Sequence, residues 1–229
     1  KECADNMYLP FNEELGIHPQ DDSFLDKDPI DIDSISPDEI PLVANWHPLV
    51  IWRYQLIKQA DVVLLLFLLG DQFTLAEKKA DFDYYEPRTT HDSSLSPAIY
   101  SIIAAELGYA EFAYNYFLQT VRLDLDDYNR NAWQGLHTAC MAGSWMGVVI
   151  GFAGMRTFGG ELSFKPFLPE QWKSYSFKVK FRGAQLQIKV RSQNTSYLLV
   201  AGDEISFSHF GQPVTLRLGT SITLENSHA

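Results

Sequence analysis

The sequence has 229 residues, of which 46% are hydrophobic and 14% aromatic, and a formal net charge of −11. These fractions provide a substantial core and argue against global disorder. A chain of this length forms one large domain or two small ones. The acidic excess argues against nucleic-acid binding, which requires a basic face.

Two further features narrow the class of protein. The apolar run 62–69 is far too short to span a bilayer, and no signal peptide is visible. Cys3 and Cys140 belong to no metal-ligand or redox motif, which is compatible with a reducing cytosol. We therefore expect a cytoplasmic protein with no membrane segment, no metal and no organic cofactor.

Residues 1–46, here called the acidic segment, show no sustained periodicity. Residues 1–39 contain twelve carboxylates and two lysines, so the rest of the chain is close to neutral. Interspersed apolar residues favour a long loop packed over other elements. The pairs Glu13-Glu14 and Asp21-Asp22 could be catalytic carboxylates, but solvated surface charge is the commoner explanation. Because the chain opens with KEC rather than methionine, we expect its true N-terminus to lie elsewhere.

From 47 to 151 the sequence alternates buried and amphipathic helices. Apolar residues on every side predict buried helices over 60–69, 98–108 and 133–151. A capping box, Thr74 with Glu77, opens an amphipathic helix that reaches about Tyr85. Another amphipathic helix is predicted over 109–121, with inward-facing Phe112, Tyr116 and Val121. This alternation indicates two concentric layers, an α/α-barrel or part of one, and five helices cannot close such a barrel.

The stretch 88–97 combines hydroxyls and an imidazole with a helix start. Ser96 is a predicted N-cap, and Pro97 suits the first helical turn. Free backbone N–H groups at the positive end of the helix dipole favour a bound anion, phosphate above all. For these residues alone, an ordinary capped loop is the alternative.

Three polar clusters precede the three buried helices, at Lys58-Gln59, at 91–94 and at 131–137. Inner helices of a double ring run parallel, so we expect the clusters to meet at one end of the barrel. Each cluster also has a structural explanation. The Lys58 stem can cover apolar surface, Gln59 and the serines can cap helices, and His137 can be a core histidine. The predicted meeting of all three favours a binding site.

After Gly151 the pattern changes to short alternating strands. They are predicted over 176–181, 185–191, 197–201, 205–209, 214–218 and 221–224. The predicted fold class is therefore α+β. Residues 1–160 form the C-terminal part of a barrel, and 161–229 form a small antiparallel β-domain of about six strands.

Six segments, in order along the chain, resemble the maltose phosphorylase family, glycoside hydrolase family 65, which also holds kojibiose, nigerose and trehalose phosphorylases. The segments are DNMYLP (5–10), HPLV (47–50), KQADVV (58–63), FDYYEP (82–87), THDSSLS (90–96) and GLH (135–137). The resemblance implies an (α/α)6 barrel followed by a β-sheet domain, in a cytoplasmic homodimer. It also implies cleavage of a maltose-like α-linked glucose disaccharide by inorganic phosphate, with inversion, to give β-glucose 1-phosphate.

By the same resemblance, Lys58 and Gln59 hold the glucosyl unit, and Ser93, Ser94 and His137 bind phosphate. His91 receives no role. One departure stands out, because the general-acid glutamate of the family lies in a GPDEY-type segment that is absent here. We expect that glutamate upstream of Lys1, so the chain contains no catalytic residue and should be inactive alone.

The mechanism makes physical sense at these residues. An inverting hydrolase needs a carboxylate that activates water, whereas phosphate is already a nucleophile and needs an anion pocket in that place. A carboxylate there would repel phosphate, so Asp92 is expected to point away or to orient a neighbour. A trehalose-type hydrolase of the same family and a non-catalytic carbohydrate-binding or assembly module remain alternatives.

Overall fold

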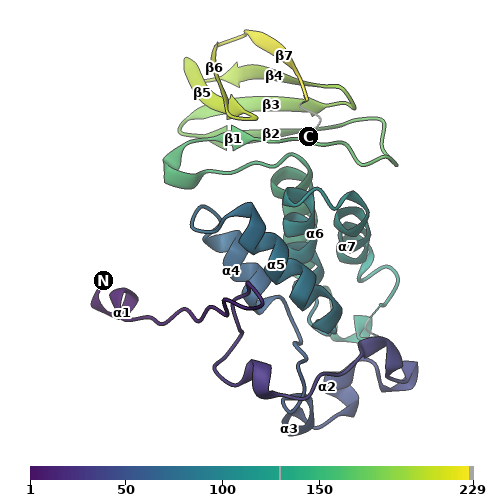
Figure 1. Ribbon diagram of the computed structural model, residues 1–229. Helices are drawn as coiled ribbons and strands as arrows, with labels where there is room; N and C mark the ends of the chain where they lie inside the picture. The colour runs from purple at the N-terminus through teal and green to yellow at the C-terminus, as the bar shows by residue number, and fades with distance from the viewer. Residues whose placement is uncertain (129, 227–229) are drawn as a thin grey trace.

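The computed structural model describes residues 1–128 and 130–226, which form a helical part below a β-sandwich (Figure 1). The helical part is built around α6, which packs against α7, α4 and α8. Its helices are α1 (Glu2–Asp5), α2 (Leu42–Asn45), α3 (Pro48–Ile51), α4 (Asp61–Leu68), α5 (Leu75–Tyr85), α6 (Ser96–Glu106), α7 (Ala110–Arg122) and α8 (Thr138–Met146).

A helix occurs in each predicted region, but the last one begins at Thr138 rather than at 133, and α8 continues as a π-helical turn over Gly147–Phe152. The Thr74 capping box is confirmed: the Glu77 backbone N–H donates to Thr74 Oγ1, and the Thr74 N–H donates to the Glu77 carboxylate. Within the described residues, none of these helices has the length and apolarity to cross a bilayer.

The prediction of buried helix faces was only partly right: Tyr116 on α7 is buried as expected, but other positions differ. On α7, Phe112 is 42% exposed, and Ala113 and Phe117 are buried in its place. Leu68 at the end of α4 and Trp145 on α8 are also exposed, although both lie in helices predicted to be buried all round. The reason is that each of these helices packs on one side only within the described part of the chain.

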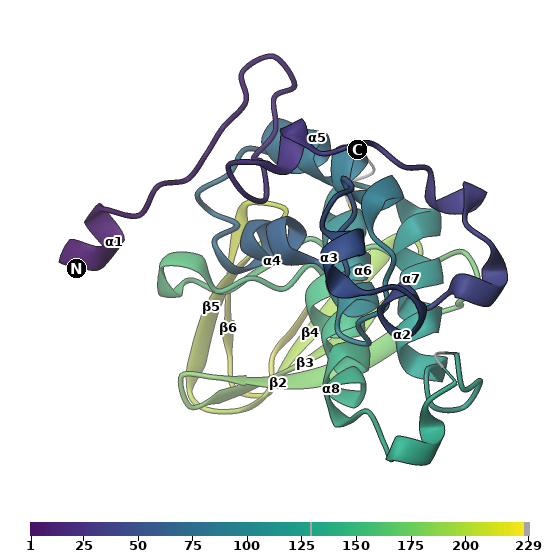
Figure 2. The same ribbon diagram turned by 90° about the horizontal axis from the view of Figure 1, so that it is seen from below.

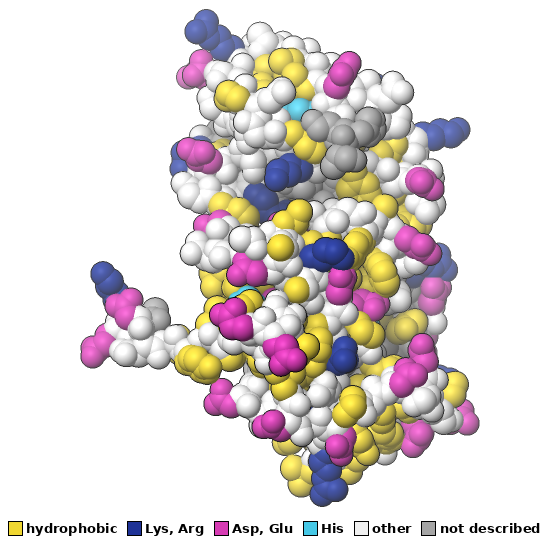
Figure 3. Space-filling view, viewed as in Figure 1, with side chains coloured by type: hydrophobic (Ala, Val, Ile, Leu, Met, Phe, Trp, Pro, Cys, Tyr) yellow, Lys and Arg dark blue, Asp and Glu magenta, His cyan; other side chains and the backbone are white. Residues whose placement is uncertain are grey.

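The acidic segment is irregular but anchored. Figure 2 shows it running from the projecting α1 across the ends of the helices, and its acidic side chains appear in magenta in Figure 3. His18 is the main anchor, because its backbone N–H and its Nδ1 each lie 2.7 Å from an oxygen of the buried Asp81 carboxylate on α5. Phe24 is buried as expected, whereas Met7 and Tyr8 are exposed.

The β-part is a sandwich of two sheets. One sheet has the order β2-β3-β4-β7 and is antiparallel, and the other has the order β1-β5-β6. The strands are β1 (Ser163–Phe164), β2 (Tyr175–Phe181), β3 (Ala184–Val190), β4 (Asn194–Ala201), β5 (Glu204–His209), β6 (Gln212–Arg217) and β7 (Ser221–Glu225). The two-residue strand β1 was missed by the sequence, and it runs parallel to β5. The predicted boundary after residue 160 falls between the π-helical turn and β1.

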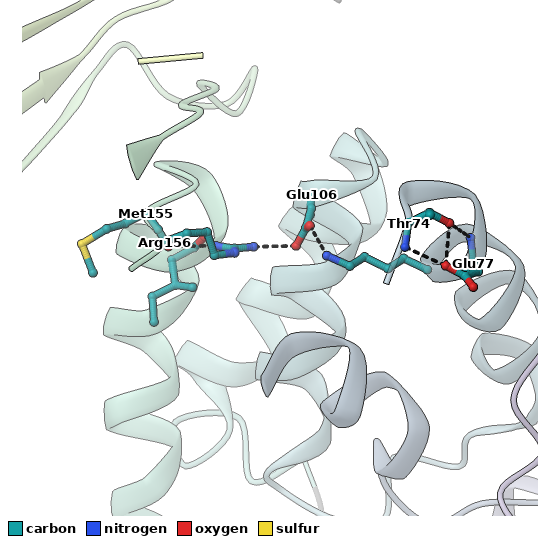
Figure 4. Close-up of polar contacts among 7 residues, drawn as sticks. Thr74, Glu77, Glu106, Met155 and Arg156 are labelled. Atoms are coloured by element: carbon teal, nitrogen blue, oxygen red, sulfur yellow. Dashed lines mark hydrogen bonds and ion pairs between the residues drawn. The ribbon is translucent and has the colours of Figure 1, made fainter. Parts of the chain in front are cut away.

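A largely buried ionic cluster lies where the two parts meet (Figure 4). The Glu106 carboxylate at the end of α6 accepts from Lys78 Nζ at 2.5 Å and from Arg156 Nη2 at 2.7 Å. Arg156 also donates to the carbonyls of Ile150 and Met155, and its backbone pairs with Ser163 of β1. These three side chains, the junction cluster, fix where the chain leaves the helices for the sandwich.

Candidate functional site

The loop before α6 is the centre of the predicted site, and its backbone is paired with the segment that carries Lys58. Ile57 N–H donates to the Arg88 carbonyl, and Thr90 N–H donates to the Ile57 carbonyl, both at 2.9 Å. This short parallel pairing brings Lys58 and Gln59 alongside residues 90–96, here called the anion loop. Both side chains are exposed, and the Gln59 amide donates to Asp61 Oδ1 at 3.1 Å.

Ser93 and Ser94 are half-buried in the turn that leads into α6. The Ser93 carbonyl accepts the Ser96 N–H at 3.1 Å, and the Ser93 hydroxyl accepts the Leu95 N–H at 3.4 Å. The Ser94 hydroxyl has no hydrogen-bond partner within residues 1–128 and 130–226. Two hydroxyls therefore lie at the positive end of a helix dipole, where an anion is stabilised.

One predicted detail of this turn is wrong. Ser96 is the first residue of α6 rather than its N-cap, and Leu95 occupies the N-cap position without a side-chain cap. The buried Ser96 hydroxyl bonds to the imidazole of His91 instead, with Oγ and Nδ1 2.8 Å apart.

His137 lies at the start of α8 and is oriented by Asp124. Its Nδ1 is 2.5 Å from Asp124 Oδ1, and its backbone N–H donates to Asp124 Oδ2 at 3.0 Å. The hydrogen bond from His137 lowers the pKa of Asp124, so the carboxylate is ionised and Nδ1 is the donor. The ring therefore presents Nε2 to any ligand, as in other histidines whose second nitrogen is held by a carboxylate.

A contact between α8 and the anion loop was not predicted. The Cys140 thiol on α8 donates to the Ser94 carbonyl, with 2.9 Å between Sγ and O. This bond connects the helix that begins after His137 to the residue that carries a predicted phosphate donor. No sequence motif indicates this contact, because the two residues are 46 positions apart.

The Asp92 carboxylate bonds to the backbone of the acidic segment, and no bond joins it to Ser93 or Ser94 within the described residues. Its Oδ2 accepts the backbone N–H of Val43 at 3.0 Å, which ties the anion loop to α2 in the acidic segment. Burial raises the pKa of Asp92, while the bond from Val43 and the positive charge of Lys58 act in the opposite direction. The carboxylate closest in sequence to the predicted phosphate site is thus turned toward a backbone donor.

A cavity of about 660 Å³ lies between residues 90–92 of the anion loop and the acidic segment. Carboxylates contribute most of the charge of its lining, which includes Asp31, Asp33, Glu86, Asp92 and Arg130. None of Lys58, Gln59, Ser93, Ser94 and His137 lines it. A cavity with this charge disfavours phosphate, so the cavity and the predicted site are different places.

The structure brings together some of the predicted residues but not all. Backbone pairing joins the Lys58 segment to the anion loop, and Cys140 joins the anion loop to the helix that follows His137. No direct bond links Lys58 or Gln59 to the serines or to His137 within the described residues. The same part of the chain contains no group of three His, Cys, Asp or Glu side chains that could hold a metal ion.

Comparisons with known proteins identify the family of the chain. Residues 1–146 match the glycosyl hydrolase family 65 central catalytic domain, and residues 155–216 match the C-terminal domain of that family. The α,α-trehalose phosphorylase of Thermoanaerobacter brockii is 51% identical over 96% of this chain, and the maltose phosphorylase of Bacillus subtilis is 44% identical over 95%. A kojibiose phosphorylase of Halothermothrix orenii is 38% identical over the entire chain.

A solved structure gives the same result for the fold. It is described as a candidate kojibiose phosphorylase from the human microbiome, and it superposes with a TM-score of 0.91 at 33% identity over 100% of this chain. The chain spans 28% to 29% of the length of the three curated relatives and 33% of that structure. With matches to both domains over most of its length, the chain belongs to glycosyl hydrolase family 65.

Proposed function

We propose that the whole protein, meaning the gene product to which this chain belongs, is an inverting disaccharide phosphorylase. Its substrates would be an α-linked disaccharide of glucose and inorganic phosphate, and its products β-glucose 1-phosphate and glucose. The curated relatives named above are phosphorylases of trehalose, maltose and kojibiose. The three disaccharides are therefore the substrates to compare.

One observation carries the proposal. Ser93 and Ser94 present hydroxyls just before α6, while the neighbouring Asp92 carboxylate is occupied by a bond from the Val43 backbone N–H. Donors without a carboxylate suit phosphate, because hydrogen bonds to a charged acceptor are strong and a carboxylate would repel the anion. A hydrolase would need a carboxylate in that place to activate water.

The other predicted residues have roles that fit the same reaction. Because Asp124 occupies Nδ1, His137 presents Nε2, which would accept a hydrogen bond from a phosphate hydroxyl, or donate one to a phosphate oxygen when the ring carries a second proton. Lys58 and Gln59 would hold the glucosyl unit whose anomeric carbon is attacked. Phosphate would form the new bond from the face opposite the leaving sugar, and a general acid would protonate the departing oxygen. That acid is proposed to lie outside this chain, which should accordingly be inactive alone.

The test is turnover by the whole protein on maltose, trehalose and kojibiose, with and without phosphate. The proposal predicts glucose release only when phosphate is present, with β-glucose 1-phosphate as the second product. Glucose release in phosphate-free buffer would identify a hydrolase, and absence of any turnover would favour a non-catalytic module. A homodimer in the cytoplasm, with an (α/α)6 barrel completed by the rest of the protein, is part of the same proposal.

A further inference from the structure

The anion loop is closed at its base by a side-chain bridge. His91 lies before the two serines and Ser96 after them, and His91 Nδ1 is 2.8 Å from Ser96 Oγ. Ser93 and Ser94 therefore lie within a loop whose ends are joined by one hydrogen bond. The geometry of the loop depends on where the His91 ring is held.

Two further residues hold that ring. His91 Nε2 lies 3.0 Å from the Tyr116 hydroxyl on α7, and Tyr116 donates its proton to Glu86 Oε1 at 2.8 Å. The Tyr100 ring packs against the His91 ring edge to face, with 4.8 Å between centroids. Both nitrogens of His91 are thus engaged by protein groups, so neither is left for a direct bond to phosphate in this arrangement.

Elementary chemistry assigns the proton in each of these hydrogen bonds. A tyrosine hydroxyl has one proton, and the Glu86 carboxylate accepts it, so toward His91 the Tyr116 oxygen is an acceptor. Nε2 of His91 must then be the protonated nitrogen. Burial lowers the pKa of His91 to about 4 and keeps the ring neutral, so Nδ1 accepts from the Ser96 hydroxyl. All bonds run in one direction, from Ser96 through His91 and Tyr116 to Glu86.

The backbone conformation of His91 is independent evidence that the surrounding residues hold it in place. His91 has a φ of 54°, in the left-handed region that most side chains avoid. Such a conformation persists where the surrounding structure determines it, and it is found preferentially at functional sites. It turns the chain sharply just before Asp92 and the two serines.

We propose that His91, Tyr116 and Glu86 are positioning residues that set the geometry of the Ser93–Ser94 anion site. The inference rests on the proposed function, and it adds residues that do not touch phosphate. If this series of hydrogen bonds is broken, the positions of the Ser93 and Ser94 hydroxyls are no longer fixed. The positions of Lys58 and Gln59 should not change. The effect should therefore fall on phosphate and spare the disaccharide.

The test compares three variants of the whole protein. Tyr116→Phe removes the acceptor for His91 Nε2–H and the donor to Glu86. His91→Asn retains a residue that tolerates the left-handed conformation but is too short to bridge Ser96 and Tyr116. Tyr114→Phe is the matched control, since Tyr114 lies on the same helix against Trp172 and its hydroxyl has no partner in the described residues.

The proposal predicts that Tyr116→Phe and His91→Asn each raise the phosphate KM about tenfold, the change that about 1.4 kcal/mol produces. The disaccharide KM and kcat should change little, and Tyr114→Phe should match the wild type. The proposal is overturned if Tyr116→Phe has the same phosphate KM as Tyr114→Phe. It is also overturned if kcat falls and both KM values rise in step with a lower melting temperature. If Tyr116→Phe does not fold, His91→Asn decides by the same criteria. If the wild type needs no phosphate, the proposed function fails, and this inference fails with it.

Discussion

The Cys140 thiol donates a hydrogen bond to the Ser94 carbonyl across 2.9 Å, which ties α8 to the turn that starts α6. Cys140 is buried, and burial raises the pKa of its thiol, so the group keeps its proton and remains a donor. The bond connects the turn that contains Ser94 to the helix that follows His137, and both residues are predicted phosphate ligands. Their relative position should depend on it.

Replacing Cys140 tests this dependence. Cys140→Ala leaves the Ser94 carbonyl without its donor, which should destabilise the protein by about 0.5–1.5 kcal/mol and raise the phosphate KM. Cys140→Ser keeps a donor of similar size and should be milder in both respects. The measurements are thermal unfolding and steady-state kinetics of the whole protein. Equal behaviour of the two variants would show that the thiol acts through packing alone.

His91 should make stability depend on pH. Burial lowers its folded-state pKa to about 4 from the ordinary value of 6.5. Between these values the unfolded chain binds a proton that the folded chain does not, so stability is lost as the pH falls from about 6.5 toward 4. His91→Asn should lack this loss. The melting temperature of the wild type should therefore drop further than that of the variant between about pH 7 and about pH 5. Parallel drops would contradict the buried neutral imidazole.

The junction cluster should be sensitive to the loss of its carboxylate. Glu106→Gln leaves Lys78 and Arg156, whose side chains are 4% and 14% exposed, without their counter-charge. A loss of about 3–5 kcal/mol in unfolding free energy is expected. Asp126→Asn breaks the exposed pair with Arg122 and is the control, with no measurable effect expected. Thermal unfolding separates the two, and equal midpoints would refute a structural role for the cluster.

The same cluster has a pH dependence of known sign. Burial raises the pKa of Glu106, but the charges of Arg156 and Lys78 outweigh it and hold the pKa below the ordinary value of 4.5. A depressed carboxyl pKa stabilises the folded state above the unfolded value, and this contribution is lost as the pH falls below about 4.5. Glu106→Gln should therefore approach the wild type in stability only under acidic conditions.

Much of the fold could be predicted from local signals. The Thr74 capping box and the alternation in β2 to β7 depend on neighbours in sequence, and both were recognised. Burial of Tyr116 on α7 was also recognised. The exposure of Phe112 and Trp145 was not, because both are as apolar as the residues that face the core. The strand β1 has two residues and pairs with a distant strand, so no local period marks it.

In the candidate site, too, local features could be predicted and long-range contacts could not. The hydroxyls and the helix start at 93–96 could be recognised in the sequence. So could the problem that an Asp92 carboxylate facing the site would repel phosphate. The bonds that orient these residues could not, since Cys140–Ser94 spans 46 positions and Asp92–Val43 spans 49. Such contacts follow from how helices pack, which composition and spacing do not encode.

Lys58 should affect turnover more than phosphate binding. If its ammonium holds the glucosyl unit, Lys58→Ala should lower kcat with both substrates saturating, because positioning of the reacting carbon is lost. Lys79→Ala is a matched control, an exposed lysine on α5 whose partner is Asp83. Equal kcat values for the two variants would remove Lys58 from the site.

The most direct test is the phosphate KM of the Ser93→Ala, Ser94→Ala double variant of the whole protein, measured with the disaccharide held at saturation. Each hydroxyl should contribute about 1.5–3 kcal/mol to binding an anion, since hydrogen bonds to charged groups fall in this range. If the two contributions add, the phosphate KM of the double variant should therefore rise by at least about a hundredfold, while the disaccharide KM stays near the wild-type value. An unchanged phosphate KM would mean that these hydroxyls serve only the turn before α6, and that phosphate binds elsewhere.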